Sequence, residues 1–180
     1  QLLCSLLGDF PCLMGADLMG RPDDLPATIQ WIACDLNLPL PVEPSSFDVV
    51  TSSEVIEHLE NSRAICREWF RVLRPGGTLI LSTPNCESWR SLLSLVFQGH
   101  FAAFNHQNYP AHITALLQLD LRRILTEAGF KEISFNFVPS GGIPKLGRLT
   151  WQAISGGLLK GRRFSDNLVA VARKPAGPLG

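Results

Sequence analysis

The sequence predicts an α/β fold with a mostly parallel sheet, and two observations support that prediction. Short apolar runs, typical of strands buried on both faces, alternate with segments that have the periodicity of amphipathic helices. The chain has 180 residues, of which 46% are hydrophobic. This is enough apolar material for the core of one domain, so the composition argues against intrinsic disorder. We therefore expect residues 1–180 to form a single domain.

Six apolar runs are read as strands, and two segments are read as clear helices. In the first of these helices, Ile65, Trp69 and Val72 recur at helical spacing, and Pro75-Gly76-Gly77 then turns the chain. Gly129 ends the second helix. The expected strands cover residues 11–17, 29–35, 47–51, 78–82, 133–138 and 167–173, and the helices cover 61–73 and 119–128.

The last two expected strands are separated by a long segment rich in Gly and Pro. We expect them to pair antiparallel, with an antiparallel edge strand near the C-terminus, which is a common addition to such sheets. Long segments without a clear strand or helix pattern also follow the fourth and fifth strands, at about 84–116 and 139–166. Loops of that length in a compact domain are usually functional.

Charge and cysteine usage narrow the class of protein. Sixteen acidic and sixteen basic residues cancel, which argues against a nucleic-acid partner. The acids gather in the first half of the chain and the bases in the second. The five cysteines form no CxxC pair, which favours reduced thiols and a cytoplasmic location. No apolar run approaches the roughly 20 residues that a transmembrane helix needs.

Acidic and hydroxyl residues follow three of the expected strands. They are Asp17, Asp35 and the run Ser52-Ser53-Glu54. In open α/β sheets, ligands bind beyond the carboxyl ends of the strands, so these residues share the rim where a cofactor would lie. Each Asp taken alone also fits a helix N-cap or a turn. Three such positions in register favour a cofactor site.

Seven short motifs follow one another in a fixed order along the chain. They are Gly15-Ala-Asp17-Leu, Cys34-Asp35-Leu36-Asn37-Leu-Pro39, Ser46-Phe47-Asp48-Val49-Val50, Glu54-Val-Ile-Glu57-His58-Leu59, Arg71-Val-Leu-Arg-Pro75-Gly76-Gly77, Ser82-Thr83-Pro84-Asn85 and Leu125-Thr-Glu-Ala128-Gly129-Phe130. Each motif is weak alone, but their order and spacing together resemble one known family, the class I S-adenosylmethionine-dependent methyltransferases. The resemblance covers roughly residues 12–138 and implies a Rossmann-like, doubly wound sheet.

The resemblance implies S-adenosylmethionine as cofactor and assigns four residues to it. Asp17 would bind the ribose, and Asp35 would accept a hydrogen bond from the adenine amino group. Leu36 would lie against the adenine ring, and Ser53 would lie beside the methionine portion. No catalytic residue is assigned, because in-line positioning of the acceptor supplies much of the rate of such a transfer.

The start of the chain departs from the family pattern. The family begins with a strand and a Gly-rich loop, and no such loop precedes Asp17. About 30 residues separate Asp17 from Phe47, which is room for one strand and its connections. We therefore expect an N-terminally truncated domain in which the first strand and the Gly-rich cofactor loop are missing.

Glu54, Glu57 and His58 fall at i, i+3 and i+4, which predicts one face of a short helix. The run resembles one found in some metal-dependent O-methyltransferases, and His106 or His112 of the first insertion could add a ligand. The alternative is that Glu57 and His58 stabilise the rim by hydrogen bonds. We assign no metal site from the sequence and leave both interpretations open.

The expected function is methyl transfer from S-adenosylmethionine to an oxygen or nitrogen of a small or lipid-linked acceptor. Apolar and aromatic residues of segment 91–112 would form one wall of the pocket that binds the acceptor. The alternative is that they belong to the ordinary core of a helix packed on the sheet. The basic segment 145–163 interleaves apolar residues, which fits peripheral contact with an anionic membrane or a solvated edge. The alternative function is a catalytically inactive Rossmann-like interaction module that has lost its cofactor loop.

Overall fold

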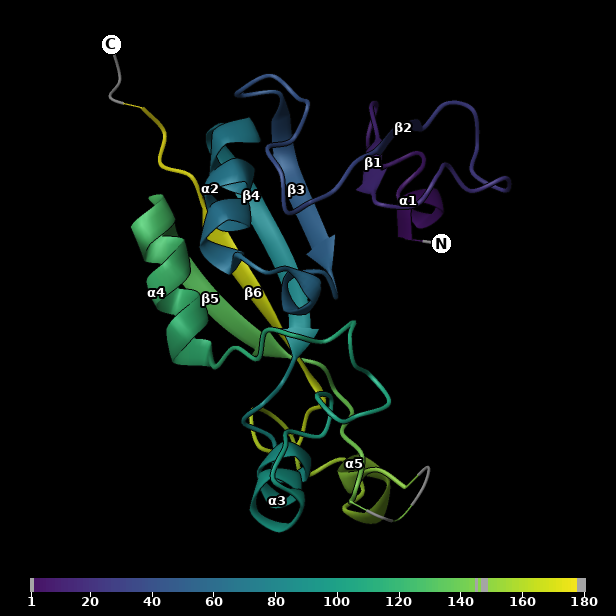
Figure 1. Ribbon diagram of the computed structural model, residues 1–180, viewed down its shortest axis with the longest axis vertical. Helices are drawn as coiled ribbons and strands as arrows, with labels where there is room; N and C mark the ends of the chain where they lie inside the picture. The colour runs from purple at the N-terminus through teal and green to yellow at the C-terminus, as the bar shows by residue number, and fades with distance from the viewer. Residues whose placement is uncertain (1, 145, 147–148, 178–180) are drawn as a thin grey trace. The chain divides into compact units, whose positions relative to one another are not determined.

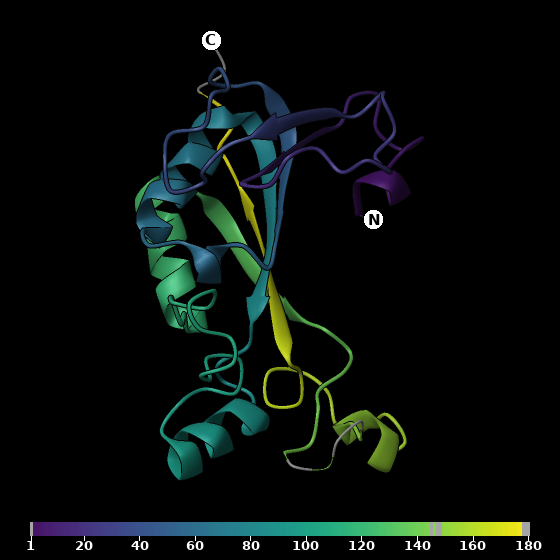
Figure 2. The same ribbon diagram turned by 45° about the vertical axis from the view of Figure 1, so that its right-hand side comes forward.

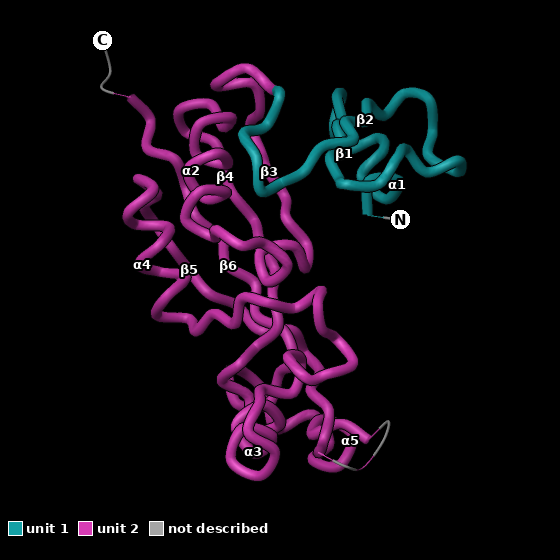
Figure 3. The backbone as a smooth tube through the Cα atoms, in the orientation of Figure 1, with its two compact units in different colours: residues 1–41 teal, residues 42–180 magenta. Residues whose placement is uncertain are grey.

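The computed structural model describes residues 2–144, 146 and 149–177, which form two compact units (Figure 3). Unit 1 comprises residues 1–41 and unit 2 comprises residues 42–180, and each is described by itself. Among the described residues, the helices are too short or too polar to cross a bilayer. The expectation of one domain for residues 1–180 stays a prediction.

Unit 1 contains a helical turn, α1 (Leu2–Ser5), and two parallel strands, β1 (Met14–Asp17) and β2 (Gln30–Ala33). Gly15 of β1 lies against the ring of Trp31, and a Cβ at this position would come within 2.5 Å of two ring carbons. Glycine is therefore needed for the close packing of the pair. Arg21 closes the connection between the strands by donating to the carbonyl oxygens of Ile29, Leu25 and Pro26.

Unit 2 is built on a four-stranded mixed sheet with the order β3-β4-β6-β5 (Figure 1). Strand β3 (Phe47–Ser53) is parallel to β4 (Leu73–Pro84). Strand β6 (Asn167–Arg173) is antiparallel to both of its neighbours, β4 and β5 (Lys131–Phe137). The carboxyl ends of β3 and β4 therefore lie at the same edge of the sheet.

Two helices, α2 (Ser62–Val72) and α4 (Gln118–Ala128), pack side by side on one face of this sheet (Figure 2). The stripe predicted for α2 is buried, and the side chain of Asn61 caps the helix by accepting from the N–H of Ala64 at 3.0 Å. The core between the helices and the sheet is apolar. It includes Ile65, Trp69, Val72, Leu79, Leu81, Leu121, Leu125, Phe130 and Leu168.

The two expected insertions contain further helices. A 3₁₀ turn, η1 (Ile56–His58), follows β3, and α3 (Trp89–Gln98) lies in the first insertion. The second insertion holds the short helix α5 (Trp151–Ile154). Both α3 and α5 lie beyond the carboxyl end of β4 (Figure 1). Lys145 and Arg148 of the basic segment fall outside the described residues.

The predicted α/β class and the alternating strands and helices are confirmed, and the last two strands do pair antiparallel. The expected position of the antiparallel strand was wrong, because β6 lies inside the sheet and the edge strand is β5. Leu168, Ala170 and Ala172 of β6 are buried on the helical side. Strand β6 carries no proline, so both of its edges can take a hydrogen-bonded partner. Its place near the end of the sequence does not reveal that it lies between two other strands.

Burial predicts very different reactivity for the cysteines. Burial raises the pKa of the Cys66 thiol from 9.0 to about 12, and it does the same for Cys86. Cys4 and Cys12 are exposed. A rise of that size lowers the thiolate fraction at pH 8 by about 1,000-fold, and the thiolate is the reactive form.

We expect iodoacetamide to alkylate Cys4 and Cys12 at least about 100-fold faster than Cys66 and Cys86 in the native protein. Peptide mass spectrometry over a time course at pH 8 measures the four rates. The same reaction in denaturant is the control, and there the rates converge. Comparable rates in the native protein would contradict the packing of α2 and of the first insertion described above.

Candidate functional site

The structure brings Asp17 and Asp35 together at one edge of unit 1. Asp17 is the last residue of β1 and is in register with Ala33, and Asp35 lies two residues beyond Ala33. Because the strands are parallel, both carboxylates lie at their carboxyl ends. Their proximity also affects Cys34, since burial and then the charges of Asp35 and Asp17 raise the pKa of its thiol.

Both carboxylates also shape their own turns. An oxygen of Asp17 accepts from the N–H of Met19 at 2.9 Å, and an oxygen of Asp35 accepts from the N–H of Asn37 at 2.9 Å. These are the local turn bonds that Asp commonly makes. Both Asp residues are nevertheless exposed, so their side chains are accessible to a ligand, and Leu36 beside them is half-buried.

Ser53 belongs to unit 2, where it is the last residue of β3. Its side chain is exposed, and the hydroxyl of Ser82 on β4 lies 3.4 Å from its hydroxyl. The structure thus gathers two of the predicted cofactor residues with Leu36 in unit 1. Ser53 lies at the carboxyl end of β3, which forms a parallel pair with β4 in unit 2.

Glu54 follows β3 in a left-handed backbone conformation, with φ at +53°. This conformation is strained for a residue with a side chain, and such strain often occurs at functional sites. Its N–H donates to the carbonyl oxygen of Ser82 at 3.1 Å, and its carboxylate accepts from the Ser82 hydroxyl at 2.9 Å. The predicted helix containing Glu54, Glu57 and His58 was therefore wrong, because only Ile56–His58 is helical.

Glu57 is fully buried and joins three segments of unit 2. One of its carboxylate oxygens accepts from the hydroxyl of Thr83 on β4 at 3.0 Å. Its backbone carbonyl accepts from the N–H groups of Ile113 and Thr114, each at 3.0 Å. The end of the first insertion is therefore fastened across η1, directly after β3.

This fastening places His112 beside His58. The Nδ1 of His58 lies 2.8 Å from the carbonyl oxygen of Ala111, and the two imidazole rings are 4.7 Å apart in an edge-on arrangement. Ligand-type atoms of Glu57, His58 and His112 lie within 4.8 Å of one another. Of the two histidines that the sequence offered as additional ligands, the structure brings His112 to the cluster. His106 instead packs near His100, with ring centres 6.4 Å apart.

The carboxyl groups of Glu54 and Glu57 lie in surroundings that disfavour their negative charge. Burial, followed by the neighbouring charge of Glu57, raises the pKa of Glu54, while the hydrogen bond from Ser82 opposes the shift. Burial is also the main cause that raises the pKa of Glu57. A cavity of about 290 Å³ opens beside them, lined by Glu54 and His112 among others. A ligand in this cavity would meet a polar wall that also includes the ion pair of Arg90 and Asp166.

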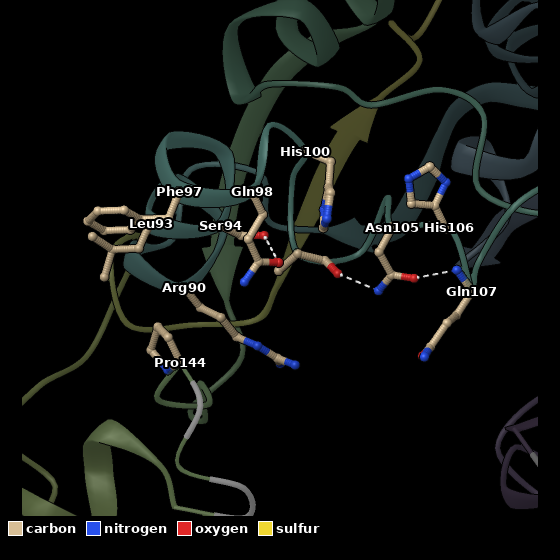
Figure 4. Close-up of a pocket in the computed structure, with 11 residues that line it drawn as sticks. Arg90, Leu93, Ser94, Phe97, Gln98, His100, Asn105, His106, Gln107 and Pro144 are labelled. Carbon is tan, nitrogen blue, oxygen red and sulfur yellow. Dashed lines mark hydrogen bonds between the residues drawn. The ribbon is translucent and has the colours of Figure 1, made fainter.

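A second cavity, of about 460 Å³, lies along α3 (Figure 4). Leu93 and Phe97 lie together at one end of it, and His100 and His106 lie toward the other. The two cavities share Arg90, Ala102 and Asn105 as lining residues. The first insertion therefore provides a surface that runs from polar groups near Glu54 to apolar groups of α3.

Asn85, directly after β4, holds the second insertion in place. Its buried amide donates to the carbonyl oxygens of Arg162 and Ser165, at 2.6 and 2.9 Å, and its oxygen accepts from the N–H of Glu87. Glu87 in turn pairs with Arg162. The sequence shows Asn85 only as part of a motif. Its role in holding the second insertion cannot be seen there, because its partners are about 80 residues away in the chain.

Comparison with known proteins finds similarity to methyltransferases. Residues 16–81 match the family model described as a methyltransferase domain, and this segment includes Asp17, Asp35, Leu36 and Ser53. The four residues that the sequence assigned to the cofactor therefore all lie inside the matched region.

Two curated relatives agree with this match. A ubiquinone biosynthesis O-methyltransferase of Idiomarina loihiensis is 27% identical over 74% of this chain and 50% of its own length. A probable S-adenosylmethionine-dependent methyltransferase of Mycolicibacterium smegmatis is 37% identical over 51% of this chain and 32% of its own length. The chain thus spans half or less of the length of these relatives.

Solved structures of two methyltransferases share the fold. A SAM-dependent methyltransferase from Archaeoglobus fulgidus aligns with a TM-score of 0.60 over 89% of this chain and 75% of its own, at 17% identity. One from Mesorhizobium loti aligns with a TM-score of 0.56 over 90% and 80%, at 18% identity. The fold is therefore Rossmann-like α/β. In sequence, residues 16–81 match a methyltransferase domain, and the chain is similar to these two methyltransferases over 74% and 51% of its length.

Replacing Asn85 with alanine removes the buried amide that joins the two insertions. We expect Asn85→Ala to lower the free energy of unfolding by about 1–3 kcal/mol, because buried carbonyl groups lose their partners. Denaturant unfolding followed by circular dichroism measures this change. Asn136→Ala, at an exposed position of β5, is the matched control and should change stability by less than about 0.5 kcal/mol. Equal effects of the two substitutions would show that the Asn85 bonds do not hold the insertion.

Proposed function

We propose that the chain is part of an enzyme that transfers a methyl group from S-adenosylmethionine to an oxygen or nitrogen of a small or lipid-linked acceptor. One observation carries the proposal. The methyltransferase-type segment 16–81 contains two exposed carboxylates, Asp17 and Asp35, side by side at the carboxyl ends of a parallel strand pair. Ligands of open α/β sheets bind at that edge.

The proposed roles follow from the chemistry of these side chains. Carboxylate oxygens only accept hydrogen bonds, so Asp17 suits the two ribose hydroxyls and Asp35 suits the adenine amino group. Leu36 offers an apolar surface for the adenine ring, and Ser53 a hydroxyl for the methionine portion. The acidic rim also favours the positive charge of the sulfonium group.

The acceptor would lie in the cavities of unit 2. Their polar end is near Glu54 and His112, and their apolar end is formed by Leu93 and Phe97 of α3. This combination suits an acceptor with a polar reacting group on an apolar body. Methyl transfer needs the acceptor atom held in line with the methyl group, at roughly 3–3.5 Å from it. The name of one relative, the ubiquinone biosynthesis O-methyltransferase of Idiomarina loihiensis, supports an oxygen acceptor among the alternatives.

Cofactor binding gives the most direct mutational test. We expect S-adenosylhomocysteine to bind the chain saturably in isothermal titration calorimetry. Asp17→Ala and Asp35→Ala should each weaken the affinity by about 10- to 100-fold, because each removes a hydrogen bond to a charged acceptor.

Asp24→Ala, at another exposed acid of unit 1, is the control and should leave the affinity unchanged. Unchanged affinity in both Asp17→Ala and Asp35→Ala would reject the assigned roles. Saturable binding would reject the inactive interaction module for this chain, and failure of the unsubstituted chain to bind the nucleoside at all would reject the proposed cofactor site for this chain.

We also propose that segment 145–163 makes peripheral contact with anionic membranes. Several of its apolar side chains are exposed, including Leu158 at 86% and Ile154 at 58%. Its charge is partly compensated within unit 2, since Arg162 pairs with Glu87. The apolar side chains would therefore contribute more to the contact than the described basic ones do.

Vesicle sedimentation tests this contact. The chain should bind vesicles of phosphatidylcholine and phosphatidylserine, and Leu158→Glu should reduce the bound fraction at least about threefold, because a charge replaces an inserted apolar group. Leu119→Glu, at a site on α4 that is 53% exposed, is the matched control and should bind like the unsubstituted chain. An equal loss in both variants, or no binding at all, would contradict the proposed contact.

A further inference from the structure

We propose that the cavity along α3 binds an oxyanion, either a carboxylate or a phosphate group, and that Arg90 is the residue that recognises it. The oxyanion would be carried by an apolar body that lies against Leu93 and Phe97, which line the same cavity. In the proposed enzyme the oxyanion would belong to the non-reacting end of the acceptor, and this assignment to the acceptor rests on the proposed function. Binding of the anion by the cavity does not.

Arg90 presents one edge of its guanidinium group to a ligand. Its Nη1 donates to Oδ2 of Asp166 at 3.0 Å, and within the described residues no group accepts from Nε or Nη2. These two nitrogens form the edge that binds the oxygens of a carboxylate or phosphate through two parallel hydrogen bonds. Arg71 shows this pairing in the same chain, where its Nε and Nη2 donate to the carboxylate of Glu68 at 3.0 and 2.8 Å.

The second insertion sets the orientation of Arg90. The same oxygen of Asp166 also accepts from the N–H of Gly142 at 2.9 Å, so the carboxylate is tied to the backbone. The guanidinium group packs against that backbone, because a Cβ at Gly142 would lie 3.3 Å from Nη1 of Arg90. A side chain that is already held by a partner loses less freedom when it binds a ligand.

The charges around Arg90 suit an anion in the larger cavity. Arg90, His100 and His106 line this cavity, and none of the described residues that line it is acidic. The acidic residues Glu54 and Asp166 line only the smaller cavity. An anion along α3 would therefore meet basic side chains without a facing carboxylate in the cavity wall.

Hydrogen bonds within the wall of this cavity occupy acceptors and leave donors. The side-chain oxygen of Asn105 accepts from the N–H of Gln107 at 2.8 Å (Figure 4). The side-chain oxygen of Gln98 accepts from the hydroxyl of Ser94 at 3.5 Å. Among the described residues, no group accepts from the amide nitrogen of Gln98 or from the imidazole of His106. The wall thus offers N–H donors, and a carboxylate or phosphate binds by accepting hydrogen bonds.

The other end of the cavity sets the rest of the ligand. Leu93 and Phe97 lie together there (Figure 4), and Phe97 is 77% exposed. A cavity of about 460 Å³ lies in the range of sites that bind drug-sized molecules. An apolar body that carries one anionic group would contact both ends.

The rival explanation is that Arg90 only joins α3 to the second insertion. The side chains of the pair with Asp166 are 46% and 37% exposed, and ion pairs of this kind contribute little to stability. The second insertion is already held by the buried amide of Asn85. A merely structural role of Arg90 also predicts no preference of the cavity for a charged ligand, so the two explanations differ in a measurable way.

NMR titration of the chain without cofactor tests the site. The probes are octanoate, octyl phosphate and octanamide, which is the neutral counterpart of octanoate. At least one of the two anions should bind at least about tenfold more tightly than octanamide, because hydrogen bonds to a charged group are the stronger ones. Shifts of the backbone amides of α3 and of residues 100–107 locate the bound molecule, and the tighter anion identifies the head group.

Arg90→Gln removes the charged edge and keeps a polar side chain of similar length. It should weaken the affinity for the tighter anion at least about tenfold and leave the affinity for octanamide unchanged, which also shows that the cavity is still formed. Arg123→Gln, at an exposed position of α4, is the matched control and should bind all three probes like the unsubstituted chain.

Equal affinities for the anions and for octanamide in the unsubstituted chain would overturn the proposal. Unchanged anion binding by Arg90→Gln would do the same, as would shifts confined to residues outside the cavity or the absence of saturable binding by any probe. If Arg90→Gln does not fold, the comparison of the three probes in the unsubstituted chain decides alone. The nucleoside is absent throughout, so the oxyanion site and the proposed cofactor site can fail separately.

Discussion

Burial of the Glu57 side chain is the constraint on which the described part of unit 2 depends. Glu57 lies in η1, its carboxylate accepts a hydrogen bond from Thr83 on β4, and its backbone carbonyl accepts from the N–H groups of Ile113 and Thr114. A carboxylate is rarely buried unless it is paired or hydrogen-bonded, so these contacts must form together with the sheet. They join the carboxyl ends of two parallel strands to an insertion that begins and ends on unit 2.

The same contacts also position the residues that line the cavities of unit 2. Once the end of the first insertion is fixed on η1, His112 lies beside His58, and the intervening chain covers the space next to Glu54. Asn85 fixes the second insertion to the same strand end through Arg162 and Ser165. Two long segments without regular strands are thus held by a small number of buried polar contacts.

Local patterns were sufficient to predict the elements of the sheet and its helical layer. The apolar spacing of Ile65, Trp69 and Val72 predicts α2, and all three are buried. Asn61 and Gly129 mark helix ends, and the structure shows the first as a side-chain cap and the second in a left-handed conformation. These signals involve residues within a few positions of one another, so a sequence carries them directly.

Features that depend on distant residues were predicted less well. The interior position of β6 depends on partners from both β4 and β5, and the choice of His112 over His106 depends on the carbonyl of Glu57. Glu54 has a left-handed backbone conformation and therefore lies outside the short helix that was expected to contain it. Asp17 and Asp35 were easier to place, because residues that follow parallel strands meet at one edge.

A crystal structure of the chain with S-adenosylhomocysteine tests the proposed cofactor site. We expect density for the nucleoside at the carboxyl ends of β1 and β2, with its ribose hydroxyls on Asp17 and its adenine amino group on Asp35. Nucleoside bound elsewhere, with both carboxylates engaged only in the turns to Met19 and Asn37, would contradict it.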